Sequence, residues 1–139
     1  MADLARSVAS LRVSGEELVP DEVSSLLGAV PSGAYARGDQ VSTHGPVRLA
    51  RHGMWTLQAS ETAPADLDAQ VNELLGLLTS DRRTWHQLAD RFAVDLFCGW
   101  FMERSNEGLW VSPHTLLTLG ERRIVLILDI YGADNEVLG

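Results

Sequence analysis

Lysine is absent from this chain of 139 residues, and all eleven basic residues are arginine. That bias is typical of a high-GC bacterial genome and indicates an origin rather than a chemistry. Cysteine occurs once, as Cys98, so an intrachain disulfide is excluded and we expect a cytoplasmic location. No uncharged apolar window reaches about 18 residues, which excludes a membrane-spanning helix. The first residues lack the apolar core of a signal peptide, so we expect none.

Positive charge is scarce relative to negative charge. The chain has 19 acidic residues against 11 basic ones, which gives a net charge of −8. A surface of this sign repels phosphate backbones and anionic membranes, so we expect neither nucleic acid nor a membrane as a partner. The charge is compatible with a basic protein partner, although acidity also serves solubility alone. The sequence leaves the oligomeric state open.

Motifs for catalysis and cofactor binding are missing too. The four histidines, at positions 44, 52, 86 and 114, have no His-x-x-x-His spacing, and no Cys-x-x-Cys occurs, so we expect no metal. Gly-x-Ser-x-Gly and the glycine-rich phosphate loops are absent as well. Cys98 stands among apolar neighbours, where a thiol is usually inert packing. We therefore expect no cofactor, and the sequence favours a protein that is not an enzyme.

Hydrophobic periodicity and turn residues divide the chain into ten elements. The predicted strands cover residues 7–14, 47–51, 54–59, 93–104, 109–111 and 122–131, and the predicted helices cover 20–28, 62–80, 81–92 and 113–120. This order, β-α-β-β-α-α-β-β-α-β, predicts a single α+β domain over residues 1–139, with helices packed on a mixed, largely antiparallel sheet. Two short helices, each opened by proline and closed by glycine, suggest pseudo-symmetric halves, with chance similarity as the alternative.

The most apolar stretch is 122–131, which has five consecutive branched aliphatic residues from Ile124 to Leu128. Apolar residues stand at odd and even positions alike, so this stretch is predicted to be an interior strand that is buried on both faces. A short acidic tail, 133–139, follows it and ends the chain.

The strongest hairpin signal joins residues 47–51 to residues 54–59. Two strand-like runs meet at His52-Gly53, and glycine can supply the positive φ that a tight hairpin turn needs. The two runs are therefore predicted to pair with each other.

Residues 29–46 have no usable period and are predicted to form a long loop. Loops of this length in compact domains often carry function. This one offers Tyr35, Arg37, Asp39 and His44, which are an aromatic ring, a cation, an anion and a titratable imidazole, as candidate binding residues. The structural alternative is that Arg37 and Asp39 form a local ion pair that only holds the loop.

Three further candidates lie in the C-terminal third. Trp110 stands on a short predicted strand, where a partly exposed indole is a good interface anchor, with ordinary packing as the alternative. Asp129 and Tyr131 share one face of the last strand. A carboxylate beside a buried run needs a partner, and Arg48 or Arg51 is the expected one, in either a structural ion pair or a binding site.

An ordered set of short motifs resembles one known family. The motifs are Leu11-Arg12-Val13-Ser14-Gly15, the 20–28 helix ending in Leu-Leu-Gly, Arg37-Gly38-Asp39, Gly53-Met54-Trp55 and Leu128-Asp129-Ile130-Tyr131. Together they resemble the uncharacterised, mostly bacterial family catalogued as domain of unknown function 4279. The resemblance covers nearly the whole chain and implies a small, single-domain α+β protein. It carries over no catalytic residue.

Two hypotheses of function follow. The first is a non-enzymatic, cytoplasmic protein-binding module, one form of which is an immunity-type inhibitor of a basic toxin; it rests on charge and size. The alternative is a small enzyme or ligand-binding protein with a polar site between the 29–46 loop and the sheet.

Overall fold

The computed structural model describes residues 1–42 and 44–133, so most of the predicted acidic tail lies outside the described residues. The strands are β1 (Ala2–Asp3), β2 (Arg6–Gly15), β3 (Gly33–Tyr35), β4 (Gly53–Gln58), β5 (Ala93–Phe101), β6 (Glu107–Gly108) and β7 (Val125–Tyr131), and the helices are α1 (Pro20–Leu27), α2 (Leu67–Leu77), α3 (Arg82–Arg91) and α4 (Pro113–Glu121).

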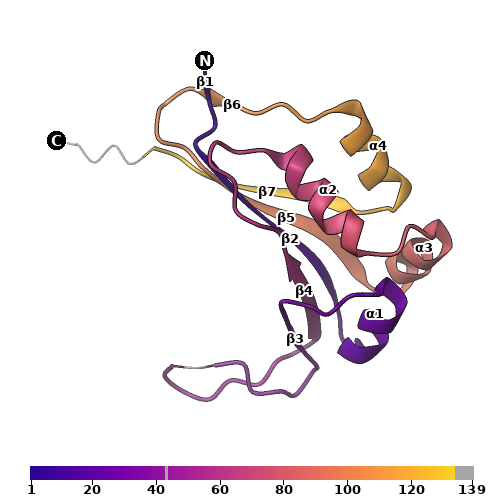
Figure 1. Ribbon diagram of the computed structural model, residues 1–139. Helices are drawn as coiled ribbons and strands as arrows, with labels where there is room; N and C mark the ends of the chain where they lie inside the picture. Colours follow the sequence, from indigo (N-terminus) through magenta and orange to yellow (C-terminus); the bar gives the residue numbers. More distant parts are fainter. Residues whose placement is uncertain (43, 134–139) are drawn as a thin grey trace.

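Five strands form the main sheet, in the order β3-β4-β2-β5-β7. β5 and β7 are parallel, and the other neighbours are antiparallel. β1 and β6 form a separate, short parallel pair. The four helices lie on one face of the main sheet (Figure 1). The predicted α+β fold with a mixed, largely antiparallel sheet is confirmed.

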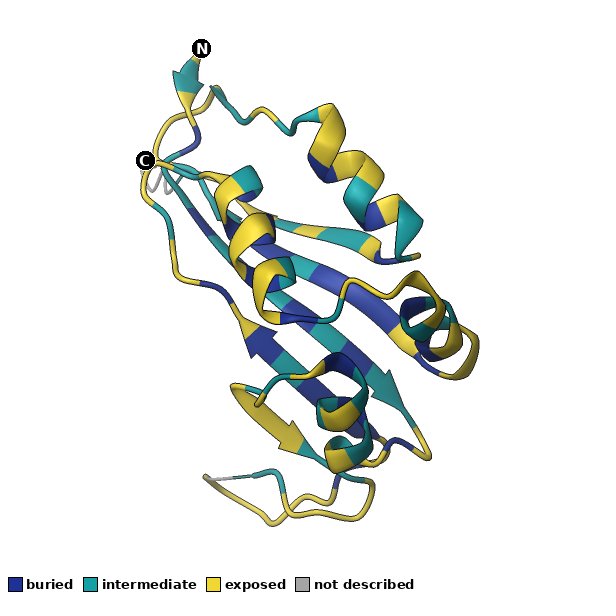
Figure 2. Cartoon of the chain, turned by 45° about the vertical axis from the view of Figure 1, so that its right-hand side comes forward, coloured by how far each residue is buried: buried dark blue, intermediate teal, exposed yellow. Residues whose placement is uncertain are grey.

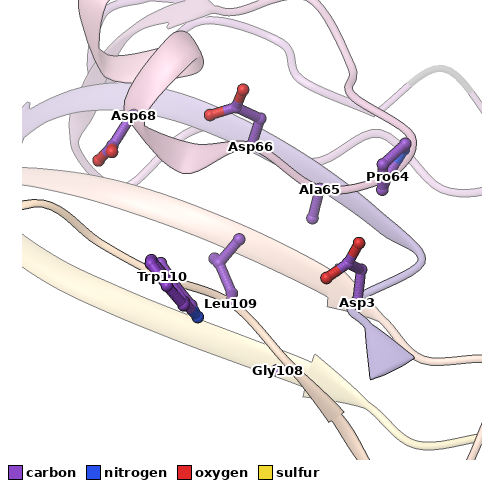
Figure 3. Close-up of a pocket in the computed structure, with 8 residues that line it drawn as sticks. All are labelled: Asp3, Pro64, Ala65, Asp66, Asp68, Gly108, Leu109 and Trp110. Atoms are coloured by element: carbon purple, nitrogen blue, oxygen red, sulfur yellow. The ribbon is translucent and has the colours of Figure 1, made fainter. Parts of the chain in front are cut away.

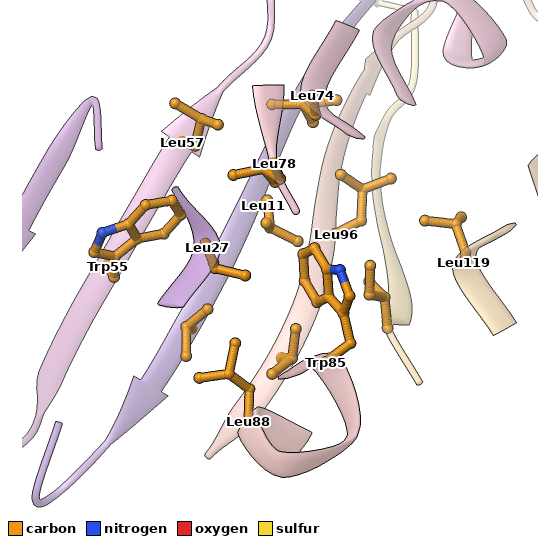
Figure 4. Close-up of a cluster of buried hydrophobic side chains, with 14 of the residues drawn as sticks. Leu11, Leu27, Trp55, Leu57, Leu74, Leu78, Trp85, Leu88, Leu96 and Leu119 are labelled. Carbon is orange, nitrogen blue, oxygen red and sulfur yellow. The ribbon is translucent and has the colours of Figure 1, made fainter. Parts of the chain in front are cut away.

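The hydrophobic core lies between the sheet and the helices. Along β2 the side chains of Ala9, Leu11 and Val13 are buried and alternate with partly exposed residues, because successive strand residues point to opposite faces. Figure 2 shows this alternation along β2 and β4, and Figure 4 shows the indoles of Trp55 and Trp85 among core leucines. Both indoles are fully buried, as are the inward residues of β2, so the core fixes how the helices sit on the sheet.

Helix ends follow local capping chemistry. α1 begins at Pro20 and ends before Gly28, whose φ of 78° gives the left-handed conformation that glycine tolerates. The Ser112 hydroxyl caps α4 by accepting a hydrogen bond from the Thr115 N–H at 3.1 Å. The prediction that Gly120 ends α4 is wrong, because the helix continues to Glu121.

α2 is shorter than predicted. It begins at Leu67 rather than near Thr62, because the Asp66 carboxylate accepts a hydrogen bond from the Ala69 N–H at 3.0 Å and so takes the capping position. Thr62 instead pairs with Ser7 in an isolated β-bridge. The segment before α2 is therefore fixed to β2 rather than coiled into the helix.

The predicted hairpin between residues 47–51 and 54–59 is wrong. β4 pairs with β3 and β2, whereas residues 47–51 fold back on the preceding loop, with a bridge between Gln40 and Leu49. β4 pairs with β2 over a longer ladder than the adjacent residues 47–51 could offer. Gly53 does not supply a positive φ; it allows a close approach, because an added Cβ would lie 2.8 Å from the Leu18 carbonyl oxygen.

The predicted strand over residues 109–111 is wrong as well. The strand in this region is β6, which precedes it and pairs with β1 rather than with β5. The Glu107 carboxylate accepts hydrogen bonds from the N–H groups of Glu103 and Arg104, and this closes the turn after β5. Residues 109–111 are consequently free to run toward α4.

β7 has the predicted strand conformation but not the predicted position. It is an edge strand of the main sheet, and β5 is its only strand partner among the described residues. The exposure of its side chains contradicts the predicted burial on both faces. Val125, Leu128 and Ile130 are 59%, 40% and 54% exposed. The apolar run predicted a strand correctly, but it could not tell on which side the strand has a neighbour.

The two halves suggested by the repeated short helices differ in their pairing. The strands that flank α1 and β3, which are β2 and β4, are antiparallel, whereas β5 and β7, which flank α4, are parallel. The similarity therefore ends with the two helices. Within residues 1–42 and 44–133, none of the helices combines the length and hydrophobicity that crossing a bilayer requires.

Candidate functional site

A pocket of about 350 Å³ lies where β1, β6 and the start of α2 meet, and we name it the Trp110 pocket. Its lining residues are Asp3, Pro64, Ala65, Asp66, Asp68, Gly108, Leu109 and Trp110. Figure 3 shows the three aspartates and the indole of Trp110 around the same hollow. The pocket therefore combines negative charge with an aromatic ring.

Backbone hydrogen bonds join the walls of this pocket. The Leu4 N–H donates to the Gly108 carbonyl at 2.8 Å, beside the β1–β6 pair, and the Ala65 N–H donates to the Leu4 carbonyl at 2.9 Å. Three segments that are distant in sequence are thus held in register. The pocket does not depend on a single flexible loop for its shape.

Asp68 fixes the wall formed by the segment before α4. Its Oδ1 accepts hydrogen bonds from the Ser112 N–H at 3.1 Å and from the Thr115 hydroxyl at 2.7 Å. Burial by itself raises the pKa of Asp68, but these hydrogen bonds, with a smaller contribution from the charge of His114, outweigh burial and leave the pKa below its ordinary value. Asp68 is therefore an ionised, structural carboxylate that holds Trp110's segment against α2.

The other two carboxylates are more available to a ligand. Asp66 is exposed and uses one oxygen to cap α2, while Asp3 is exposed and has no side-chain hydrogen bond among the described residues. Trp110 is 85% exposed, the highest exposure of any large apolar side chain in the described part of the chain. An open indole beside available carboxylates is suited to a cationic group, which gains from the ring face and from the charge.

A metal ion does not fit this arrangement. Among the described residues, no three His, Cys, Asp or Glu side chains gather closely enough to hold one. The aspartates of the Trp110 pocket are spread around its walls, so they suit an organic cation better than a coordinated ion (Figure 3).

A second pocket, of about 280 Å³, lies on the loop between β3 and β4, and we name it the Arg48 pocket. Its lining residues are Tyr35, Val41, Arg48, Leu49, Ala50, Arg51 and His52. Six of the chain's other arginines form ion pairs with carboxylates, whereas none is found for Arg48 or Arg51 within the described residues. In an acidic protein this pocket is locally basic.

Of the loop residues predicted to bind, one lines this pocket, and the others make separate local contacts or none. Tyr35 lines it, whereas Arg37 pairs with Glu17 at 3.4 Å rather than with Asp39. Asp39 accepts a hydrogen bond from the Ala36 N–H at 2.8 Å, which closes a local turn. His44 is exposed, and only its backbone carbonyl has a partner among the described residues.

Asp129 and Tyr131 meet each other at the opposite edge of the sheet. The Tyr131 hydroxyl donates to Asp129 Oδ2 at 2.8 Å, and this hydrogen bond, together with the carboxylate's charge, raises the pKa of Tyr131. The ring also stacks on Phe101 with centroids 4.7 Å apart.

The expected pairing of Asp129 with Arg48 or Arg51 is wrong. Both arginines line a pocket with Tyr35 of β3, the edge strand opposite β7. Four strand spacings separate the two edges, a distance of about 19 Å. The candidates therefore do not converge: Tyr35 belongs to one pocket, Trp110 to another, and the Asp129–Tyr131 pair to neither.

The sequence analysis named Trp110 as a candidate but none of the aspartates around it. In the sequence, Asp66 and Asp68 stand near the start of the predicted 62–80 helix, where acidic residues are common, and Asp3 belongs to no predicted element. The exposure of Trp110 comes from the structure, so the sequence held no signal that joins these aspartates to the indole.

Comparison with known proteins gives a family and nothing finer. The model of the family described as Domain of unknown function (DUF4279) matches residues 5–133, nearly the whole chain. No curated protein and no solved structure matches the chain.

Proposed function

Because the chain belongs to the family described as Domain of unknown function (DUF4279), which brings no activity with its description, we propose a function from the geometry. The protein is a non-enzymatic module that binds a basic protein, and the Trp110 pocket receives an arginine or lysine side chain of that partner. The observation that carries this proposal is an indole that is 85% exposed at an acidic pocket.

The energetics favour a cation at this place. A guanidinium or ammonium over an indole face gains about 0.5–1 kcal/mol at an exposed site. Asp3 and Asp66 add two carboxylates to the same pocket, and the net charge of −8 attracts a basic protein from a distance. Tryptophan is also among the residues that contribute most to protein interfaces.

One form of this module is an immunity-type inhibitor, a small acidic protein that neutralises a basic toxin in the bacterial cytoplasm. The size and charge of the chain support this form. The single thiol, Cys98, is buried and unpaired, which suits a reducing compartment.

A short arginine peptide tests the pocket directly. We expect titration with tetra-arginine to shift the indole N–H signal of Trp110 in a two-dimensional NMR spectrum, with the assignment made from the signal lost in Trp110→Ala. Binding should weaken about two- to fivefold in Trp110→Ala, the equivalent of the cation–π contribution. It should also weaken with added salt, because exposed charges are screened.

Charge-matched variants separate the pocket from the overall charge. We expect Asp3→Asn with Asp66→Asn to reduce peptide affinity about threefold, whereas Glu16→Gln with Asp21→Asn, which removes two exposed carboxylates near α1, leaves it within error. Equal losses in the two double variants would show that only net charge matters. Failure of a lysate pull-down to return any salt-sensitive protein partner would count against the proposed function.

The Arg48 pocket supports a second candidate function, the binding of a small anionic ligand between the loop and the sheet. Two arginines without ion-pair partners among the described residues, a histidine and the Tyr35 ring line the same hollow. Arginine is well suited to phosphate and carboxylate groups because its planar guanidinium donates two parallel hydrogen bonds.

Inorganic phosphate is the probe for this candidate. We expect NMR signals of the 35–52 region to shift on titration in the native protein and to stay unchanged in Arg48→Gln with Arg51→Gln. Arg83→Gln is the matched control, since Arg83 is exposed on α3 and also forms no ion pair among the described residues. Shifts that persist in the double variant would exclude the Arg48 pocket as the anion site.

A further inference from the structure

The Trp110 pocket offers a ligand more hydrogen-bond acceptors than donors. Asp3 is exposed, and its carboxylate has neither an ion pair nor a hydrogen bond among the described residues. Asp66 uses Oδ1 to accept a hydrogen bond from the Ala69 N–H at 3.0 Å, and Oδ2 has no partner within the same residues. None of the residues that line the pocket is basic. The pocket therefore suits a cation that carries several N–H groups.

A main-chain carbonyl adds a further acceptor. The chain between Gly108 and Ser112 contains neither a turn nor a bend, and alternate residues of an extended chain direct their N–H and C=O groups to the same side. The Gly108 carbonyl accepts a hydrogen bond from the Leu4 N–H, and the Ser112 N–H donates to Asp68, both at the walls of the pocket. Trp110 lies midway, so its carbonyl, which has no partner in the described part of the chain, faces the same hollow.

These acceptors belong to three separate segments. Asp3 lies on β1, Asp66 at the start of α2 and Trp110 on the segment before α4, and Figure 3 shows them on different walls of the pocket. A lysine ammonium donates from one nitrogen atom, whereas a guanidinium donates five N–H groups from three nitrogens in one plane. Acceptors that are spread around a hollow are therefore matched better by the wider group.

The indole favours the same ligand. Its side chain is 85% exposed, so a ring face is open to a planar group. A guanidinium stacks flat on an aromatic ring and keeps its N–H groups in its own plane, where they can reach carboxylates beside the ring. An ammonium over the ring is more strongly hydrated and directs part of its N–H groups at the ring. Stacking and hydrogen bonding are thus compatible for arginine and compete for lysine.

We infer that the Trp110 pocket is selective for arginine over lysine. This inference rests on the proposed function, the binding of a basic protein through the same pocket, and it narrows the residue that the partner inserts. Trp110 supplies the stacking surface, and Asp3 and Asp66 accept hydrogen bonds at the edges of the guanidinium. At about 350 Å³ the pocket is at the small end of ligand sites, which fits one side chain.

Peptides of equal charge test this selectivity. The probes are tetra-arginine, tetra-lysine and tetra-arginine in which each guanidinium carries two methyl groups on one terminal nitrogen. We expect tetra-arginine to bind about fivefold more tightly than tetra-lysine, measured from the indole N–H signal of Trp110 in NMR titrations. The methylated peptide should bind as weakly as tetra-lysine, because methylation keeps the charge and removes N–H donors.

The outcomes separate the inference from the proposed function. Equal affinities of the three peptides would overturn the selectivity and leave a general cation site at Trp110. If none of the peptides shifts the Trp110 signal, the proposed function itself is wrong.

Trp110→Leu tests the role of the indole. Leucine keeps an apolar side chain but has no ring face, so we expect the preference for arginine to fall below about twofold, measured from the backbone amide signals of Asp3 and Asp66. Tyr131→Leu is the matched control, because Tyr131 is an aromatic residue that is 49% exposed beside a carboxylate, Asp129, outside the pocket. Its fivefold preference should persist. Loss of the preference in both variants, or in neither, would overturn the inference.

The two carboxylates are tested by the same ratio. In Asp3→Asn with Asp66→Asn we expect the preference for arginine to fall to about twofold, because the bidentate acceptors at the edges of the guanidinium are lost. Asparagine is also a good capping residue, so α2 should keep its start and its circular dichroism signal. Glu16→Gln with Asp21→Asn removes the same charge elsewhere and should leave the ratio at fivefold. An unchanged ratio in the first double variant would contradict the assigned acceptors.

Discussion

Gln70 of α2 is a fully buried amide whose replacement should destabilise the protein sharply. Its Oε1 accepts a hydrogen bond from the Ser7 hydroxyl at 2.6 Å, and its Nε2 donates to the Ser7 carbonyl at 2.8 Å and to the Ser60 carbonyl at 3.1 Å. Ser7 and Gln70 are both 0% exposed. This group of bonds joins α2 to β2 inside the apolar core.

The cost of Gln70→Leu can be worked out from these contacts. The substitution leaves the Ser7 hydroxyl and the Ser60 carbonyl without a protein partner, whereas the Ser7 carbonyl keeps the Thr62 N–H at 3.1 Å. Each buried polar group left unpaired costs about 1–3 kcal/mol. Ser7 is buried, whereas Ser60 is exposed and its carbonyl can bind water instead, so we expect the free energy of unfolding to fall by about 2 kcal/mol.

A double-mutant cycle isolates the buried pair. Ser7→Ala alone should cost about 1–2 kcal/mol, because it leaves the Gln70 oxygen unpaired. The double variant should cost about 2 kcal/mol rather than the sum, because the hydroxyl and the amide are then removed together. Urea unfolding monitored by circular dichroism, with unchanged m-values, measures each corner of the cycle.

Gln87→Leu, on the exposed face of α3, is the control and should lie within about 0.5 kcal/mol of the native protein. Two results would refute the reasoning. One is a Gln70→Leu variant as stable as the native chain; the other is strict additivity in the cycle, which would mean that the two side chains do not act as a pair.

Three further predictions concern glycine, the thiol and the α2 carboxylate. Gly53→Ala should lower the free energy of unfolding by about 2 kcal/mol, because the new Cβ would lie 2.8 Å from the Leu18 carbonyl oxygen. Gly76→Ala, with open space around it in α2, should raise the free energy of unfolding by about 0.5–1 kcal/mol. Changes of the same sign in urea unfolding would contradict the expected contrast. Burial raises the pKa of Cys98 from 9.0 to about 12, so the unfolded chain loses its thiol proton first as the pH rises. The free energy of unfolding should therefore fall between these pH values by as much as about 1.4 kcal/mol per pH unit. Native Cys98 should also resist a thiol reagent that labels the urea-unfolded chain at once. Asp68 has a lowered pKa in the folded state, so its contribution to the free energy of unfolding is present above pH 3.8 and is lost as the pH falls below that value. Asp68→Asn should lower the free energy of unfolding by about 1 kcal/mol at neutral pH and flatten the acid limb of the plot of stability against pH. An unchanged acid limb would show that the carboxylate is not coupled to folding.

The candidate sites show which features of this protein a local sequence pattern can predict. The sequence named Trp110 as a candidate anchor, with ordinary packing as the alternative. Asp3 and Asp66 lie beside it only because β1 pairs with β6 and the Ala65 N–H before α2 donates to the Leu4 carbonyl. The expected cluster at Asp129 failed for the same reason. Whether two distant residues meet depends on strand order, which neither residue encodes.

The sequence by itself determined the four helices and the strands β2, β4, β5 and β7, because their patterns depend on residues within a few positions of one another. It missed the short strands β1, β3 and β6, whose two or three residues carry no period. Only the tertiary structure decided which strands are neighbours. Residues 47–51 lie outside the main sheet and β7 lies at its edge, because the pairing of each strand depends on segments that are far apart in the chain. The apolar run that predicts an interior strand is thereby left with one open side.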